Sequence, residues 1–199
     1  AGLLFFNNLN ILICFCEISL GMRITEIEQN YLILKKKIGK GDHQAYAKAA
    51  LAYLMTPLPW SNPFSMSIWG RMWSTYSLFD PSYSNRQSFG FFVDVGNGWT
   101  TIPTCVIWNW IIYFGDGDVL IFSPFFVGCI GIASYWQILY GTIIYWFSFI
   151  FNKRYQGHTA ANIAGFVGAT NAMWFVFPIM AIYAAVCMLR DDSFSVLQQ

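Results

Sequence analysis

A clear indication of a membrane helix is the apolar stretch NIAGFVGATNAMWFVFPIMAIYAAVCM, Asn162 to Met188, which contains no acidic or basic side chain. A helix rises 1.5 Å per residue, so about 20 apolar residues cross the roughly 30 Å of hydrocarbon in a bilayer. The stretch exceeds that length and therefore predicts a membrane-spanning helix. Because Pro178 lies inside it, we expect a kink there, with the freed backbone carbonyl satisfied by a neighbouring helix.

Three more apolar stretches precede this one along the chain. They cover Ala1 to Leu20, Phe89 to Phe114, and a span within Val119 to Phe151. Asn7, Asn8 and Asn10 interrupt the first of them. The four stretches together predict an all-α integral membrane bundle of about four spans.

The composition agrees with this class. The chain of 199 residues is 56% hydrophobic, 20% aromatic and 11% charged, whereas soluble domains average about 45–50% apolar and 25% charged residues. This leaves too little polar surface for a water-soluble globule, and it excludes a disordered chain and a nucleic-acid binder with a basic face. The formal net charge of +1 gives no reason to expect an acidic partner.

Most of the charge lies in one segment, which suggests how the chain is divided. The sequence has 11 basic and 10 acidic residues, and more than half of them lie between Met22 and Ser88. We expect a first span over 1–21, a polar inserted loop over 22–72, a core with three spans over 73–190, and a polar tail over 191–199.

The inserted loop carries two local signals. Asp42 is expected to cap a short helix that begins at His43 and lies on the membrane surface. By the positive-inside rule, the cluster Lys35 to Lys40 and the segment Asn152 to Arg154 share the inner side of the membrane, with the acidic turn Gly115 to Asp118 outside.

The five cysteines fit a structural role. They are small hydrophobic side chains without metal-ligand spacing, so we predict no disulfide, metal site or cofactor. They are Cys14, Cys16, Cys105, Cys129 and Cys187.

Asp94 is the acid best placed within a span to do chemistry. Asp94, Asn97 and Thr101 follow i, i+3, i+7 and share one helical face. A carboxylate in a span is costly, so it normally faces the bundle interior and marks a site. The alternative is that Asp94, near the start of its span, only reaches interfacial water.

Other polar side chains also share faces within the spans. Asn171 and Trp174 either line a pocket together or pack between helices. Glu17, close to the end of the first span, is a further candidate, or it snorkels to the interface. The candidates on the third span are Ser134, Gln137, Tyr140 and Tyr145.

Three segments of the chain resemble one family. WSTYSLFDPSY, Trp73 to Tyr83, followed by Asp94, resembles the W-x-x-Y-x-x-x-D-x-x-Y…acid segment of emopamil-binding proteins. These are sterol Δ8–Δ7 isomerases of the EXPERA superfamily. QILYGTIIYWF from Gln137 and TNAMWFVFP from Thr170 resemble two later family segments, and the three occur in the family's order.

The resemblance implies an EXPERA bundle around an apolar, sterol-sized cavity. In that family an acid protonates a ring double bond and a tryptophan stabilises the carbocation. By carry-over, Asp94 is the acid, Trp174 the stabilising ring and Asn171 a positioning group. Asn97, Thr101, Gln137, Tyr140 and Tyr145 are then expected to contact the substrate.

The chain also departs from the family pattern. Asp94 replaces a glutamate, Asn97 replaces a threonine, and Thr142 replaces an aspartate. Ile13 stands where the family has a histidine four residues before the acid Glu17, and the two histidines of this chain, His43 and His158, lie outside the spans. A general base must come within hydrogen-bond reach of its proton.

These departures favour a non-catalytic protein that binds a membrane lipid or a sterol, or that is an accessory subunit of a larger membrane complex. The alternative is an active sterol isomerase in which Glu17 substitutes for the histidine. A proton path through Asp94 is a third hypothesis. The resemblance points to the endoplasmic reticulum, whereas a complex subunit also fits a mitochondrial or other organellar inner membrane.

Overall fold

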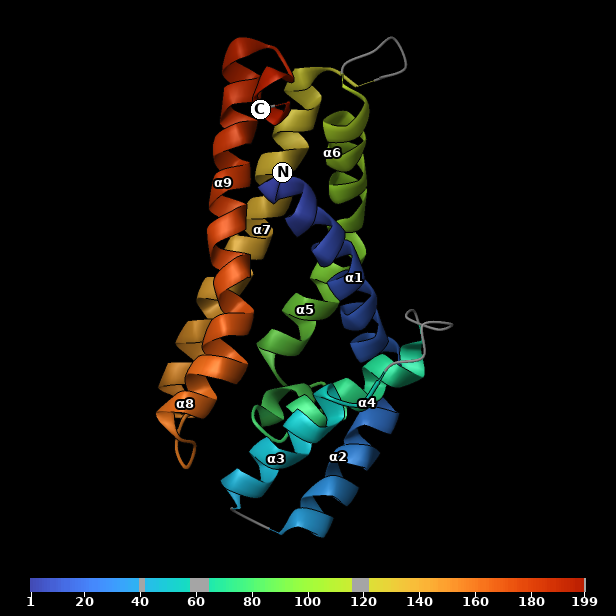
Figure 1. Ribbon diagram of the computed structural model, residues 1–199, viewed down its shortest axis with the longest axis vertical. Helices are drawn as coiled ribbons and strands as arrows, with labels where there is room; N and C mark the ends of the chain where they lie inside the picture. Colours follow the sequence, from blue (N-terminus) through green and yellow to red (C-terminus); the bar gives the residue numbers. More distant parts are fainter. Residues whose placement is uncertain (40–41, 58–64, 116–121, 199) are drawn as a thin grey trace.

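The computed structural model describes residues 1–39, 42–57, 65–115 and 122–198, and within these ranges the chain is helical without strands. This confirms the all-α fold class (Figure 1). The elements are α1 (Gly2–Met22), α2 (Ile24–Ile38), α3 (His43–Leu54), α4 (Met66–Tyr76), the 3-10 turn η1 (Pro81–Tyr83), α5 (Phe89–Thr100), α6 (Ile102–Phe114), α7 (Pro124–Phe151), α8 (Ala160–Ile163), the π-helical stretch η2 (Ala164–Ala169), α9 (Thr170–Asp191) and the 3-10 turn η3 (Ser195–Leu197).

Among the residues that the structure describes, three helices are long and apolar enough to cross a membrane, so the chain is an integral membrane protein. They are α1 with 21 residues, α7 with 28, and the continuous helical segment Ala160–Asp191 with 32. Side chains on the outside of this bundle, such as Phe147, Phe151 and Phe175, are exposed and apolar, as lipid contact requires.

The predicted span from Phe89 to Phe114 is not one helix. It breaks at Thr101 into α5, with 12 residues, and α6, with 13. Pro103 has no backbone N–H and therefore cannot bond the carbonyl of Trp99 in the preceding turn. Each half is shorter than the roughly 20 residues that a straight span needs. Figure 1 shows α6 continuing in a new direction from the end of α5.

Pro178 lies inside α9, as predicted, and its freed carbonyl is bonded by a neighbouring helix. The carbonyl belongs to Trp174, and the Thr142 hydroxyl of α7 donates to it at 3.3 Å. Thr142 thus contributes to α7–α9 packing.

Small residues set how closely the helices approach. A Cβ atom added at Gly98 of α5 would lie 3.0 Å from the Cys14 carbonyl oxygen of α1. A Cβ atom at Gly128 of α7 would lie 3.0 Å from the Ala185 oxygen of α9. These glycines bring the backbones of α1 and α5, and of α7 and α9, into contact.

The inserted segment, predicted as a polar loop with one surface helix, contains the helices α2 and α3 and the start of α4 among its described residues. We call α2, α3, α4 and η1 together the basal unit. Asp42 caps α3 as predicted, because its Oδ1 accepts from the backbone N–H of Ala45 at 2.9 Å. Tyr31, Tyr46 and Leu78 give the unit a small core of its own, and such a core explains why this polar segment folds.

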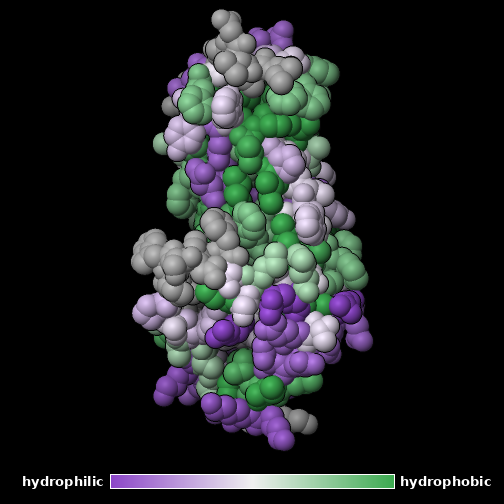
Figure 2. All heavy atoms as spheres, turned by 90° about the vertical axis from the view of Figure 1, so that its right-hand side faces the viewer, coloured by the Kyte–Doolittle hydropathy of each residue, from purple (hydrophilic) through white to green (hydrophobic). Residues whose placement is uncertain are grey.

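The surface divides in the same way. Figure 2 shows hydrophilic side chains gathered over the basal unit and hydrophobic side chains over the bundle above it. Lys40, at the end of the basic cluster, and 116–118 of the predicted acidic turn lie outside the described residues.

Candidate functional site

Asp94 lies on the first turns of α5 and lines a small pocket between α5 and α7. The pocket holds about 10 Å³ and is bordered by Gly90, Gly141, Tyr145 and Arg154, among others. This volume is about that of a single water molecule. Asp94 is half-buried, and the pocket beside it has no room for a sterol.

Glu17 of α1 is a second acid close to Asp94. Its side chain is 7% exposed, and its Cβ approaches α5 at Gly98, one turn from Asp94. The two carboxyl groups are close enough for their charges to repel. Glu17 Oε2 has no hydrogen-bond partner among the described residues. Glu17 is thus buried beside Asp94, and the alternative in which it snorkels to the interface is wrong.

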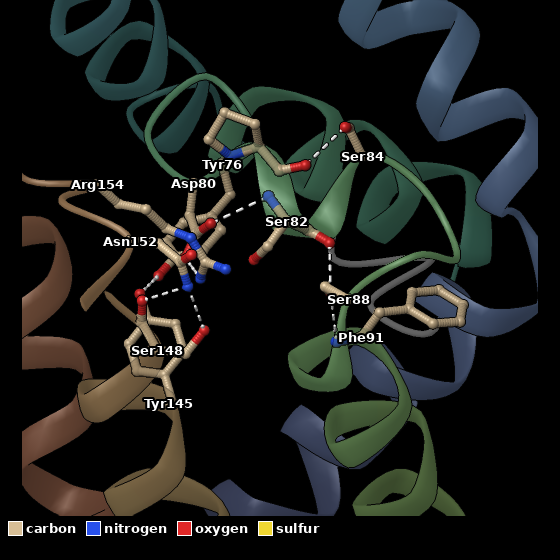
Figure 3. Close-up of polar contacts among 11 residues, drawn as sticks. Tyr76, Asp80, Ser82, Ser84, Ser88, Phe91, Tyr145, Ser148, Asn152 and Arg154 are labelled. Atoms are coloured by element: carbon tan, nitrogen blue, oxygen red, sulfur yellow. Dashed lines mark hydrogen bonds and ion pairs between the residues drawn. The ribbon is translucent and has the colours of Figure 1, made fainter. Parts of the chain in front are cut away.

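The W-x-x-Y-x-x-x-D segment forms a corner that joins the basal unit to the bundle (Figure 3). The Trp73 indole N–H donates to the Cys16 carbonyl of α1 at 2.7 Å. The hydroxyls of Tyr76 and Tyr145 lie 3.1 Å apart. Asp80 is fully buried and accepts from Arg154 Nη1 at 3.1 Å.

Tyr83, the last aromatic residue of this segment, reaches the acid. Its hydroxyl lies beside the Asp94 carboxyl group. Burial raises the pKa of the Tyr83 phenol well above its usual value, and the negative charge of Asp94 raises it further. Tyr83 therefore stays protonated at neutral pH and is available as a hydrogen-bond donor to Asp94.

A second polar group lies one to two turns further along α5. The Gln137 amide donates to Asn97 Oδ1 at 2.8 Å and to the Thr100 hydroxyl at 2.7 Å. The Thr101 hydroxyl donates to the Asn97 carbonyl at 2.9 Å. The structure thus brings together Asn97, Thr101 and Gln137, which the sequence also grouped as candidates, but in a network of their own.

Trp174 takes part in packing rather than in the Asp94 pocket. Its indole N–H donates to Asn10 Oδ1 at 3.1 Å, and its ring meets Phe6 edge-on at 6.1 Å between centroids. Asn10 precedes Glu17 by two turns of α1, which is about 10 Å along the helix axis. The Trp174 indole is therefore bonded about two turns of α1 away from Glu17, whose Cβ approaches α5 next to Asp94.

Two further candidates lie away from the acids. The Asn171 amide donates to the Val167 carbonyl of its own helical segment at 2.8 Å. Tyr140 is 46% exposed and stacks on Trp136. Of the later candidates, Tyr145 alone borders the Asp94 pocket among the residues that the structure describes.

The sequence analysis did not predict that the asparagines of α1 form hydrogen bonds to other helices. Asn10 joins three helices, because its amide also donates to the Thr101 hydroxyl at 3.2 Å. Asn7 accepts from the Tyr135 hydroxyl at 2.7 Å. Amides three residues apart in an otherwise apolar helix are a signal for contacts between helices, and that signal was available in the sequence.

The described residues contain no group of three or more side chains suited to a metal ion. The arrangement at Asp94 consists of two acids and a phenol between helices, beside a water-sized pocket that Arg154 also lines. Such a group can hold or pass a proton. Comparisons with protein-family models, curated proteins and solved structures give no match for the chain.

Proposed function

We propose that this chain is an EXPERA-type membrane protein without turnover, which binds a membrane lipid or sterol or is an accessory subunit of a larger membrane complex. The observation that carries the proposal is the separation of Asp94 from Trp174. An isomerase of this type needs its acid and its cation-stabilising ring to face one shared cavity that holds the substrate. Here the ring is bonded to Asn10 instead.

The size of the Asp94 pocket supports the same proposal. Small-molecule sites typically measure about 300–1,000 Å³, whereas the pocket at Asp94 holds about 10 Å³. The space is closed by close approach of α7, where a Cβ atom at Gly141 would already collide with Val93.

An active sterol isomerase is the second candidate, and the Glu17–Asp94 pair favours it. Glu17 is buried and Asp94 is half-buried, and where α1 contacts α5 one acid could donate a proton while the other accepts one. In this alternative, Glu17 performs the task of the absent histidine, and a cavity opens between α5 and α7.

Complementation separates the two functions. The full chain is expressed in cells that lack sterol Δ8–Δ7 isomerase, together with Asp94→Asn and Trp174→Ala. The matched controls are Asp191→Asn and Trp110→Ala, at exposed positions. We expect no rescue by the wild-type chain, and we expect native purification to recover it with bound lipid or in a larger assembly.

Rescue that both site variants abolish and both controls retain would overturn the non-catalytic proposal. For an EXPERA-type protein we propose the endoplasmic reticulum, and for a complex subunit a mitochondrial or other organellar inner membrane. Fractionation of the tagged chain distinguishes these membranes.

A further inference from the structure

A larger pocket lies between the basal unit and the connection from α7 to α8. It has a volume of about 380 Å³, within the range of small-molecule sites. Its walls come from α2, α3, the α4–η1 connection and the segment after α7. Arg154 is the residue that it shares with the pocket at Asp94.

Basic side chains converge on this pocket. Lys35 comes from α2, and Lys153 and Arg154 come from the segment that follows α7. None of the described lining residues is acidic. Arg154 is paired with Asp80, but in the part of the chain that the structure describes neither lysine forms an ion pair. The pocket therefore carries uncompensated positive charge.

Lys35 is held in place with its charge retained. Its Nζ donates to the Tyr31 hydroxyl at 2.9 Å and lies 5.1 Å from the centre of the same ring. The hydrogen bond to Tyr31 raises the pKa of Lys35. The ammonium group therefore stays protonated at neutral pH.

Two histidine rings form another wall of the pocket. His43, the first residue of α3, and His158 meet edge to face with centroids 4.4 Å apart. The Nδ1 atom of each is buried and has no hydrogen-bond partner among the described residues. Buried polar atoms are normally bonded, and exceptions often mark a site where a ligand, ion or water binds.

Gly157 makes this arrangement sterically feasible. It has φ +83°, and a Cβ atom there would collide with the His43 ring. Beneath the rings, Leu78 and Phe79 are buried, and Phe79 stacks on His158 at 5.1 Å. The pocket therefore has a cationic rim and an apolar floor.

The position along α7 places this rim where lipid headgroups lie. Lys153 comes two residues after Phe151, which ends the spanning helix α7 and is 77% exposed. Basic residues directly beyond a span contact the phosphates of anionic lipids.

We propose that this pocket binds a phosphate monoester, with the phosphate between Lys35, Lys153 and Arg154 and its organic body on the apolar floor. Phosphate oxygens match several converging charged donors. Both a lipid headgroup, as in phosphatidic acid, and a soluble ester carry this group. The site does not depend on the proposed EXPERA-type function, because it uses neither Asp94 nor Trp174.

The test uses the purified full chain with two probes. Glycerol 3-phosphate is titrated in detergent while the thermal unfolding midpoint is recorded. Nanodiscs of phosphatidylcholine with and without phosphatidic acid are analysed for retained phosphatidic acid by native mass spectrometry. We expect stabilisation or retention with at least one probe, and about a tenfold weaker affinity for Lys35→Gln/Lys153→Gln because two charged contacts are lost.

The matched control is Lys36→Gln/Lys48→Gln, which removes the same charge from exposed lysines outside the pocket. It should change the affinity by less than about twofold, because exposed charges interact weakly. Lys35→Arg/Lys153→Arg retains both positive charges and should still bind the probes. Circular dichroism checks that each variant is folded. If the glutamine variant is misfolded, binding by the arginine variant still tests the phosphate site.

The two probes also identify the source of the phosphate. Binding of glycerol 3-phosphate alone indicates a soluble ester, and retention of phosphatidic acid alone indicates a lipid headgroup. The proposal fails if the folded wild-type chain binds neither probe, or if the control pair weakens binding as much as the pocket pair does.

Discussion

At the scale of single residues, Asn10 has the largest structural role of the polar side chains in the bundle. It accepts from Trp174 on α9 and donates to Thr101 at the break between α5 and α6. It is 3% exposed. In hydrocarbon, a buried amide is tolerated because its partners satisfy it. Asn10 therefore fixes how α1, α6 and α9 are placed around one another.

We predict that Asn10→Leu destabilises the folded chain by about 1–3 kcal/mol, because the Trp174 N–H loses its acceptor and the Thr101 hydroxyl loses one of its hydrogen bonds. Unfolding in a detergent titration, followed by tryptophan fluorescence, measures the change. Asn8→Leu is the control, since Asn8 is exposed and accepts a single part-buried hydrogen bond from another helix, that of the Asn109 amide. Equal losses in both variants would contradict a special role of Asn10.

At the scale of helices, two glycines of α5 allow the effect of helix packing on stability to be measured apart from the effect of helix propensity. Gly98 lies against the α1 backbone, at 3.0 Å from the Cys14 oxygen for an added Cβ atom, whereas an atom added at Gly96 meets nothing within 4 Å. The same helix thus offers a contact position and an open position two residues apart.

Gly98→Ala should destabilise the protein by about 1–3 kcal/mol, because α1 and α5 must move apart to admit the methyl group. Gly96→Ala should be neutral or stabilise the protein by up to about 1 kcal/mol, because alanine favours the helix. The same unfolding assay measures both. The close-contact interpretation would be wrong if the two variants behaved alike.

At the scale of the whole molecule, one ion pair joins the basal unit to the bundle. Asp80 precedes η1 and Arg154 follows α7, and the side chains are 0% and 17% exposed. Removing one partner of a buried pair leaves the other charge uncompensated, which costs more than the pair itself contributes. The position of the basal unit on the bundle therefore depends on this contact.

Asp80→Asn should weaken the docking of the basal unit by about 2–4 kcal/mol. Hydrogen exchange should become faster in α3 and α4 and stay unchanged in α7 and α9. Asp191→Asn breaks an ion pair with Arg190 that is exposed and should alter neither region. Faster exchange throughout the chain would instead indicate that the two parts unfold together.

The amino-acid sequence was enough to predict the class of the protein and its long apolar helices. Long apolar stretches predict spans because a bilayer core cannot satisfy backbone groups outside helices. The cap at Asp42 and the helix carbonyl freed four residues before Pro178 could also be predicted, because both depend on residues that are close in the sequence. The break between α5 and α6 at Thr101 was not predicted. Proline is tolerated in the first turn of a helix, but Pro103 does not by itself require a new helix to begin there.

Which polar residues contact one another depends on the tertiary structure. Asp94 and Trp174 share a sequence pattern with one family, but their partners come from other helices, Tyr83 and Glu17 for the acid and Asn10 for the indole. His43 and His158 lie 115 residues apart in the sequence and are neighbours in space because α3 packs near the end of α7. Helical periodicity fixes the face on which a side chain lies, whereas its partner depends on how the helices pack, which is a property of the whole chain.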